Sequence, residues 1–311
     1  MRDRLFILAF FLLISALLPP FTKSRAEEKP ALSLPDSFSI LLTETGTLYP
    51  VTPEEYLVGC LAAQIPIDYA QEALNAQAAA SYTYALRLLG NAAALPDGAL
   101  LSDDGKTAQP FFPPEKCAEL YGTSYDDYLP RLKEAAAYGV SHPITYDGEP
   151  IYAVYHSVSA GRTSASYGIW GVELPYLAPA ESQADKNYIN YECDNEMTVE
   201  NARLALVAVQ SDIVTPADYG KWFSEVNRNE DGYVISIKIG NNLFSGGDIW
   251  RIFGLRSTAF EVSYQNGIFT FHTKGYGHGA GLSQYGANEM AKEGKTAEEI
   301  LKHYYSGVKI G

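Results

Sequence analysis

The stretch at residues 271–287 constrains the fold most, because glycine alternates with other residues there between two regular segments. The repeated glycines are Gly275, Gly277, Gly279 and Gly281. Glycine adopts positive φ and lets another backbone or a ligand approach closely. A strand is expected before this stretch and a helix from about Ser283. The sequence therefore predicts a tight strand–loop–helix connection, in which the His278 side chain is exposed and reaches into a cleft. The glycine spacing fits neither a phosphate loop nor a dinucleotide fingerprint.

The N-terminus predicts export from the cytoplasm. Residues 1–4 are basic overall, and an apolar run broken only by Ser15 covers residues 5–18. That run is shorter than the roughly 20 residues that a membrane-spanning helix needs. It suits a signal peptide cleaved after Ala26, whereas extension to Phe21, followed by Lys23, would make it an uncleaved anchor. Both alternatives predict that the rest of the chain lies outside the cytoplasmic membrane, either secreted or anchored.

Composition divides the chain and excludes one class of partner. Residues 1–26 form the leader, residues 27–37 a linker, and residues 38–311 a single domain. The net charge is −14, and the leader contributes +3, so the exported part carries −17. Affinity for nucleic acid comes mainly from contacts of Lys and Arg with phosphates. A chain this acidic is therefore not expected to bind nucleic acid.

Neither metal nor cofactor is expected. The cysteines are Cys60, Cys117 and Cys193, far apart and odd in number, without zinc-ligand spacing. Three reduced thiols are the favoured interpretation, and one disulfide of undetermined pairing is the alternative. The isolated His278 has no partner at metal-ligand spacing.

The pattern of elements predicts an α+β fold, with mixed or antiparallel sheets between N-terminal and C-terminal helices. Thr52 and Glu55 form a capping box for a helix that ends before Pro66. The alanine-rich run at 72–86 predicts a central, closely packed helix. Asp-Gly at 147–148 and Asn-Gly at 266–267 predict hairpins, the first with a second strand running to Ser157. Further helices are expected at 198–209, 215–225 and 296–305, the last with a capping box of Thr296 and Glu299. Residues 178–198 are expected to be loop-rich.

Several short motifs occur in one order along the chain. The last of them runs Gly-x-Gly-His-Gly-x-Gly-x-Ser-Gln-x-Gly-Ala from Gly275 to Ala287 and is followed by Met-Ala, Glu-Ile-Leu and His-Tyr-Tyr. Earlier matches include Glu-Tyr-Leu at 55–57, Tyr-His-Ser at 155–157, Gly-Arg-Thr at 161–163 and Gly-Leu-Arg-Ser-Thr at 254–258. From about residue 38 to its end, the chain resembles the SpoIID/LytB family.

The resemblance implies a groove-containing fold that acts on the cell wall. Members of the family bind peptide-free peptidoglycan strands and cut between N-acetylmuramic acid and N-acetylglucosamine. A glutamate protonates the leaving oxygen, and the muramic 6-hydroxyl closes to a 1,6-anhydro ring. The implied partners in spore formers are an amidase and a membrane scaffold of the engulfment complex.

The position of the family's catalytic glutamate differs here. The family motif Ala-Ala-Glu-Met-Pro corresponds to residues 62–66, which places Gln64 at the acid position. An amide cannot titrate near neutral pH, and general acid–base catalysis is worth roughly 10²–10⁴ in rate. Asn75 stands where the family commonly has lysine, and Tyr82 where it commonly has arginine.

The remaining candidates come from two glycine-containing loops and are expected to line one wall of a groove, with the turn at Gln64 as the other wall. They are Tyr155, Ser157, Ser159, Gly161, Arg162, Thr163, His278, Gly279, Ser283 and Gln284. The alternative for Ser157 and Thr163 is a hydrogen bond to their own loop backbone, and for Arg162 a surface ion pair.

Three hypotheses follow. In the first, the protein binds glycan strands in sporulation with little or no cleavage, as a pseudoenzyme of the family. In the second, it is an active lytic transglycosylase that uses a displaced acid, with Asp68, Glu72 or Glu173 as candidates. In the third, it is a structural member of the engulfment complex without glycan affinity.

Overall fold

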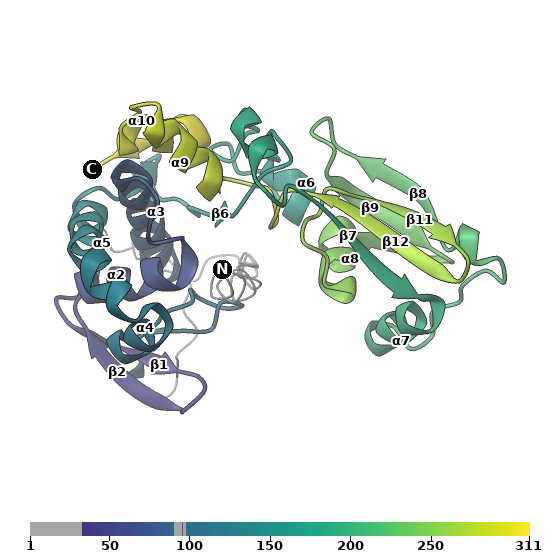
Figure 1. The fold of residues 1–311 in the computed structure, drawn as a ribbon, viewed down its shortest axis with the longest axis horizontal. Helices are drawn as coiled ribbons and strands as arrows, with labels where there is room; N and C mark the ends of the chain where they lie inside the picture. The colour runs from purple at the N-terminus through teal and green to yellow at the C-terminus, as the bar shows by residue number, and fades with distance from the viewer. Residues whose placement is uncertain (1–32, 90–94, 96–97) are drawn as a thin grey trace. The chain divides into compact units, whose positions relative to one another are not determined.

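The computed structural model describes residues 33–89, 95 and 98–311, which form two compact units (Figure 1). Unit 1 comprises residues up to 154 together with 287–311, and unit 2 comprises residues 155–286. The expected leader lies outside the described residues, as does most of the expected linker. Among the described residues, no helix has the length and apolar character needed to cross a membrane.

Unit 1 is mainly helical. Its helices are α2 (Pro53–Gln64), α3 (Gln71–Leu89), α4 (Pro114–Tyr121), α5 (Thr123–Ser141) and α10 (Ala297–Tyr304), and α9 (Gln284–Lys292) runs into it from unit 2. The expected capping boxes are confirmed, with Thr52 and Glu55 at α2 and Thr296 and Glu299 at α10. Each box satisfies backbone donors that would otherwise lack a partner in the first helical turn.

Helix α3 is the centre of unit 1, as its alanine content predicted. It packs against α2, α5 and α10. Ala73, Ala76 and Ala79 have no exposed surface. On α5, a Cβ at Gly139 would lie 2.7 Å from the Ala78 carbonyl carbon, so the two helices approach at backbone distance. Small side chains on both helices make this close packing possible.

Two small sheets complete unit 1. In the first, β1 (Phe38–Leu42) pairs antiparallel with β2 (Thr47–Val51) and parallel with β3 (Leu101–Ser102). In the second, β4 (Ile144–Tyr146) lies between β5 (Glu149–Pro150) and β14 (Lys309–Ile310). The expected Asp-Gly hairpin is present, but its second strand ends at Pro150 rather than Ser157. Proline has no N–H with which to extend the ladder.

Unit 2 contains two three-stranded sheets and a short parallel pair. One sheet has the order β11 (Phe260–Gln265), β12 (Ile268–Lys274) and β7 (Glu192–Thr198). The other has the order β10 (Asn242–Ser245), β9 (Val234–Ile239) and β8 (Phe223–Arg228). The parallel pair joins β6 (Tyr155–His156) and β13 (Leu282–Ser283). The unit also has α6 (Ser166–Trp170), η2 (Gln183–Asn187), α7 (Val199–Val209), η3 (Tyr219–Lys221) and α8 (Gly246–Phe253).

The core of unit 2 is rich in aromatic side chains. Phe271 of β12 packs against Phe253 of α8 and Phe223 of β8, with ring centroids 5.0 and 5.4 Å apart. Trp222 is buried beside Phe269 at 5.4 Å. Such ring pairs add about 0.5–1.5 kcal/mol each beyond the area they bury.

The α+β class is confirmed. In unit 2, two local expectations are wrong and one helix was not expected. The expected helix at 215–225 is a single 3₁₀ turn followed by β8, whose residues pair with β9. The expected loop at 178–198 contains β7, paired along its length with β12. Helix α8, which lies between β10 and β11 in the chain, was not expected. It begins with a capping box of Ser245 and Asp248.

Candidate functional site

The alternating glycines behave as predicted. Gly275, Gly277, Gly279 and Gly281 all have positive φ, between 71° and 109°. A Cβ on Gly275 would lie 2.6 Å from the Val158 carbonyl oxygen, and a Cβ on Gly279 would lie 2.2 Å from the Tyr233 ring. The glycine loop is therefore pressed against its neighbours at distances that no side chain at these positions would permit.

The two glycine-containing loops of the sequence lie against each other within unit 2. Val158 and Tyr276 exchange backbone hydrogen bonds of 3.1 and 2.7 Å, and the Ser164 N–H donates to the Gly279 carbonyl at 2.7 Å. The parallel pairing of β6 with β13 places Tyr155 opposite Leu282. Residues more than 100 positions apart in the chain thus form one backbone framework.

Asp185 ties this framework together. Its carboxylate accepts a hydrogen bond from the Ser159 N–H at 2.8 Å and another from the Ser283 hydroxyl at 3.0 Å. Burial raises the pKa of Asp185 to about 6, while hydrogen bonds from Ser159, Ser283 and Ser182 act in the opposite direction. Sequence reasoning missed this residue, because a lone aspartate in a stretch expected to be a loop carries no signal of its own.

Arg162 is paired with acidic side chains. Its guanidinium lies 2.5 Å from Asp231 and 3.1 Å from Glu181, and its side chain is 39% exposed. The Arg162 carbonyl accepts a hydrogen bond from the buried Tyr233 hydroxyl at 3.0 Å. The structure therefore shows the ion pair that was the alternative interpretation of Arg162. The exposed part of the guanidinium can still contact a ligand.

The other loop residues are mostly buried and bonded to backbone. The Thr163 hydroxyl accepts the Ala180 N–H at 2.8 Å, and the Ser159 hydroxyl accepts the Gly161 N–H at 3.1 Å. The carbonyl of the half-buried Ser157 accepts the Tyr285 N–H at 3.0 Å. Tyr155, Ser159, Thr163, Ser283 and Gln284 are all buried.

His278 is buried, so the expectation of an exposed ring was wrong. Its centroid lies 5.1 Å from Trp170 and 5.5 Å from His156, and only 2% of its surface is exposed. The flanking glycines have no side chains that could shield the His278 ring, but their small size lets the rings of Trp170 and His156 pack against it. Burial lowers the pKa of His278 to about 4 and that of His156 to about 3. Both imidazoles are neutral at physiological pH.

The hydrogen bonds to the Ala280 backbone define the roles of these two imidazoles. His278 Nδ1 accepts the Ala280 N–H at 3.1 Å. His156 Nδ1 lies 3.0 Å from the Ala280 carbonyl, which can only accept, so this nitrogen carries the proton of the neutral ring and donates. The pair holds the glycine loop in place, which is a positioning role.

Gln64 lies at the end of α2 in unit 1 and has no exposed surface. Its side-chain amide donates to the Pro110 carbonyl at 2.7 Å. At this buried position, the Gln64 side chain therefore acts as a hydrogen-bond donor to the protein backbone.

The other two unit 1 candidates are also engaged inside the unit. Asn75 accepts from the Gln71 amide at 3.0 Å and donates to Glu72 at 3.3 Å. The Tyr82 hydroxyl accepts the Leu34 N–H at 3.2 Å. Both side chains are buried, at 5% and 2% exposure.

The alternative acids differ in their surroundings. Glu72 accepts the Ala297 N–H at 2.6 Å with one oxygen and the Asn75 amide with the other. Asp68 and Glu173 are exposed.

Thiols and metal-ligand groups add no further site. Cys60, Cys117 and Cys193 are free, and burial raises the pKa of the Cys117 thiol to about 11. Within the described ranges, no group of three or more His, Cys, Asp or Glu side chains is arranged to hold a metal ion.

Comparison with known proteins identifies the family. The family model for stage II sporulation protein (SpoIID) matches residues 43–137. The stage II sporulation protein D of Bacillus amyloliquefaciens is 31% identical over 292 residues, covering 93% of this chain and 82% of that protein. That of Bacillus subtilis (strain 168) is 32% identical over 279 residues, covering 89% and 79%. The amidase enhancer of the same Bacillus subtilis strain is 24% identical over 302 residues, covering 82% of this chain and 40% of that protein. The chain therefore belongs to the stage II sporulation protein D family.

Proposed function

We propose that this protein binds peptide-free glycan strands of the cell wall during sporulation and cleaves them little or not at all. Membership of the stage II sporulation protein D family supports the process and the substrate class. The proposal that the protein cleaves little or not at all rests on Gln64, a buried amide at the position where the family has its glutamate.

The chemistry of Gln64 argues against ordinary catalysis. A general acid must release a proton to the leaving oxygen and later recover one. An amide N–H does not titrate near neutral pH, so Gln64 can donate a hydrogen bond but cannot transfer a proton. In this structure that donation goes to Pro110, within the protein itself.

The proposed binding surface draws on the loop framework of unit 2. Arg162 is a cation with exposed surface in that framework, and Ser157, five positions earlier in the chain, is half-buried. The buried members, Ser159, His278 and Ser283, hold the loop backbone in shape. We assign contact with the sugar hydroxyls to the first two residues and positioning to the last three.

The displaced-acid alternative has less support. A glycosidic general acid needs an environment that keeps it protonated near neutral pH. Asp68 and Glu173 are exposed at the surface, and neither is enclosed by other side chains as a buried acid would be. Both Glu72 oxygens already accept hydrogen bonds from within unit 1, one from the Asn75 amide and one from the Ala297 N–H.

The proposal includes a location and partners. The expected leader at residues 1–26 supports a location outside the cytoplasmic membrane, secreted or anchored. An amidase that removes stem peptides would supply the peptide-free strands, and the similarity to an amidase enhancer supports such a link. A membrane protein of the engulfment complex is the other proposed partner.

A product assay on peptide-free glycan tests the proposal. The purified full chain is incubated with denuded strands, retention is measured by co-sedimentation, and 1,6-anhydromuramic ends are counted by mass spectrometry. We expect retention without new anhydro ends, while a lytic transglycosylase of known activity produces them under the same conditions.

The other outcomes assign the competing functions. Anhydro ends that vanish in Glu72→Ala but persist in Gln64→Ala would establish the displaced acid. Absence of retention, together with co-purification of a membrane partner, would establish the structural role.

A further inference from the structure

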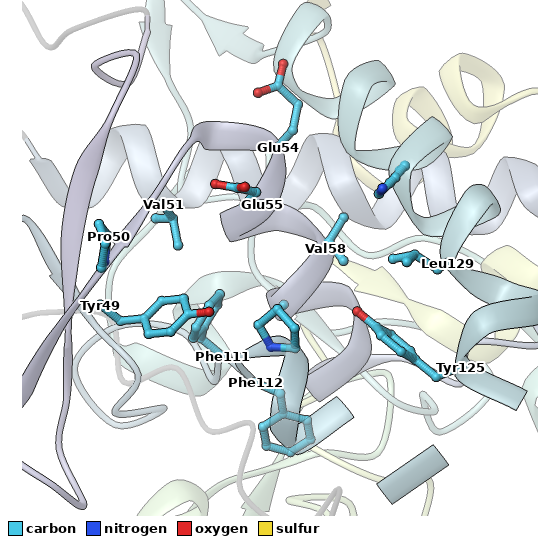
Figure 2. Close-up of a pocket in the computed structure, with 13 residues that line it drawn as sticks. Tyr49, Pro50, Val51, Glu54, Glu55, Val58, Phe111, Phe112, Tyr125 and Leu129 are labelled. Atoms are coloured by element: carbon cyan, nitrogen blue, oxygen red, sulfur yellow. The ribbon is translucent and has the colours of Figure 1, made fainter. Parts of the chain in front are cut away.

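Unit 1 contains a pocket to which the proposed function assigns no role (Figure 2). Its volume is about 450 Å³, and it lies among β2, the first half of α2, the segment before α4, and α5. We call it the α2 pocket. None of the candidate residues for glycan binding or cleavage lines it. A pocket of this size accommodates a small organic group or one to two side chains.

Four aromatic side chains line the pocket, together with the aliphatic Val58 and Leu129 (Figure 2). They are Tyr49, Phe111, Phe112 and Tyr125. The rings of Tyr49 and Phe111 have centroids 5.9 Å apart. The π faces of such rings carry partial negative charge and attract organic cations. Within this chain, the Lys116 ammonium already lies 4.9 Å from the centre of the Phe112 ring.

The wall is preformed rather than assembled around a ligand. A Cβ on Gly59 would lie 2.2 Å from the Phe111 ring, so glycine at this position is what allows Phe111 to pack on α2. The Phe112 N–H donates to the Gly59 carbonyl at 3.2 Å, and Phe111 stacks on Tyr56 at 6.1 Å. These contacts fix the aromatic segment before any ligand arrives, which lowers the entropic cost of binding.

The mouth of the pocket is acidic. Glu54 and Glu55 come from the first turn of α2, and Lys133 is the cation among the lining residues. One Glu55 oxygen accepts the Thr52 N–H at 2.8 Å, whereas Glu54 is exposed and forms no ion pair in the described part of the chain. Burial, with the negative charge of Glu115 and Glu55, raises the pKa of Tyr49. Carboxylates thus outnumber ammonium groups around the aromatic wall.

We propose that the α2 pocket binds a short basic–apolar peptide segment of a partner protein. A Lys or Arg side chain would lie against the rings of Tyr49 and Phe111 with its charge toward Glu54, and an adjacent apolar side chain would fill the space beside Leu129. Lys133 would face a main-chain carbonyl or an acidic group of the same segment. This inference does not depend on whether the protein binds or cleaves glycan.

A glycan strand fits the pocket less well. Sugars need many hydrogen-bonding groups, and most of the wall is hydrocarbon. Charge complementarity also favours a cation, since an uncharged sugar gains little from Glu54.

Fluorescence anisotropy with a defined probe tests the inference. The probe is a fluorescein-labelled octapeptide of alternating leucine and arginine, and the comparison peptide replaces each arginine by glutamine. The full chain is titrated in detergent, as wild type and as Glu54→Gln, Leu129→Trp and Glu119→Gln. Leu129→Trp fills the pocket without changing charge. Glu119→Gln removes an exposed carboxylate of α4 that does not line the pocket.

We expect the arginine peptide to bind at least tenfold more tightly than the glutamine peptide. Glu54→Gln should weaken binding at least threefold and Leu129→Trp at least tenfold, while Glu119→Gln should change the Kd less than twofold. Glu54 is exposed, so its variant should fold even if Leu129→Trp does not.

Equal weakening by Glu54→Gln and Glu119→Gln would overturn the proposal, because it would mean that the peptide is attracted by overall negative charge. An unchanged Kd in a folded Leu129→Trp protein would also overturn it. Displacement of the peptide by peptide-free glycan, with weaker glycan retention in Leu129→Trp, would assign the pocket to sugar instead.

Discussion

Replacing Asp185 by asparagine tests whether one buried carboxylate controls the stability of the loop framework. Burial raises the pKa of Asp185 from its ordinary value of 3.8 to about 6. The folded state therefore binds a proton more tightly than the unfolded chain does. Stability from this group is complete below about pH 4 and is lost as the pH rises through about 6.

The size of the effect follows from the same two values. Each pKa unit corresponds to 1.36 kcal/mol, so a rise from 3.8 to about 6 corresponds to about 3 kcal/mol. Asparagine cannot titrate. The free energy of unfolding of Asp185→Asn, relative to wild type, should thus improve by about 2.4 kcal/mol between pH 4 and pH 7, because a small part of the full effect is already present at pH 4.

Tryptophan fluorescence is a suited assay, because the chain has three tryptophans and all lie in unit 2, at positions 170, 222 and 250. Urea titrations at pH 4, 5, 6 and 7 would compare wild type with Asp185→Asn. Asp212→Asn, which changes an exposed carboxylate of the same unit, is the matched control. Parallel pH dependence of wild type and Asp185→Asn would refute the reasoning.

The remaining predictions concern the glycine loop, the buried imidazole and the family's acid position. Gly279→Ala should lower the free energy of unfolding by roughly 2–5 kcal/mol, because φ is +84° and the new Cβ would overlap the Tyr233 ring. Gly267→Ala, in an open hairpin turn, should lower it by only about 1 kcal/mol. Urea titration would measure both losses, and equal losses would contradict the packing argument. In an NMR pH titration, His278 should show no transition between pH 5 and 8, since burial lowers its pKa to about 4, and a midpoint near 6.5 would show that the ring is solvated. Gln64→Glu should not produce anhydromuramic ends, because Asn75 and Tyr82 also differ from the residues common in the family. The stability of this variant should fall as the pH rises, because an ionised carboxylate would face the Pro110 carbonyl. Mass spectrometry of glycan products and urea titration check the two parts.

Features with local causes could be predicted from the sequence. The capping boxes at Thr52 and Thr296 and the Asn-Gly hairpin at 266–267 depend on residues within four positions, and all three are confirmed. The glycines of the Gly-His loop are equally local, since positive φ is a property of each residue. The alanine-rich helix was predictable because only small side chains allow close packing on all sides.

Features that depend on distant partners could not be predicted. Strand β7 consists largely of polar residues, and only its pairing with β12 makes it a strand. Asp185 becomes central because Ser283, 98 positions later, donates to it. His278 is buried by Trp170 and His156, which lie more than 100 positions away. For His278, the local pattern of flanking glycines indicated exposure, and tertiary packing reversed it.

The surroundings of Gln64 suggest why binding could persist when cleavage is lost. The Pro110 carbonyl accepts a hydrogen bond from the side chain at this position. A protonated glutamic acid could make the same donation, and the carbonyl would disfavour its ionised form, which is what a general acid requires. Glutamine preserves the donation without the proton transfer, so α2 can keep its packing. The loop framework is held separately, by Asp185 within unit 2. A change from glutamate to glutamine at position 64 would therefore remove the acid and leave the loops that are proposed to hold the strand intact.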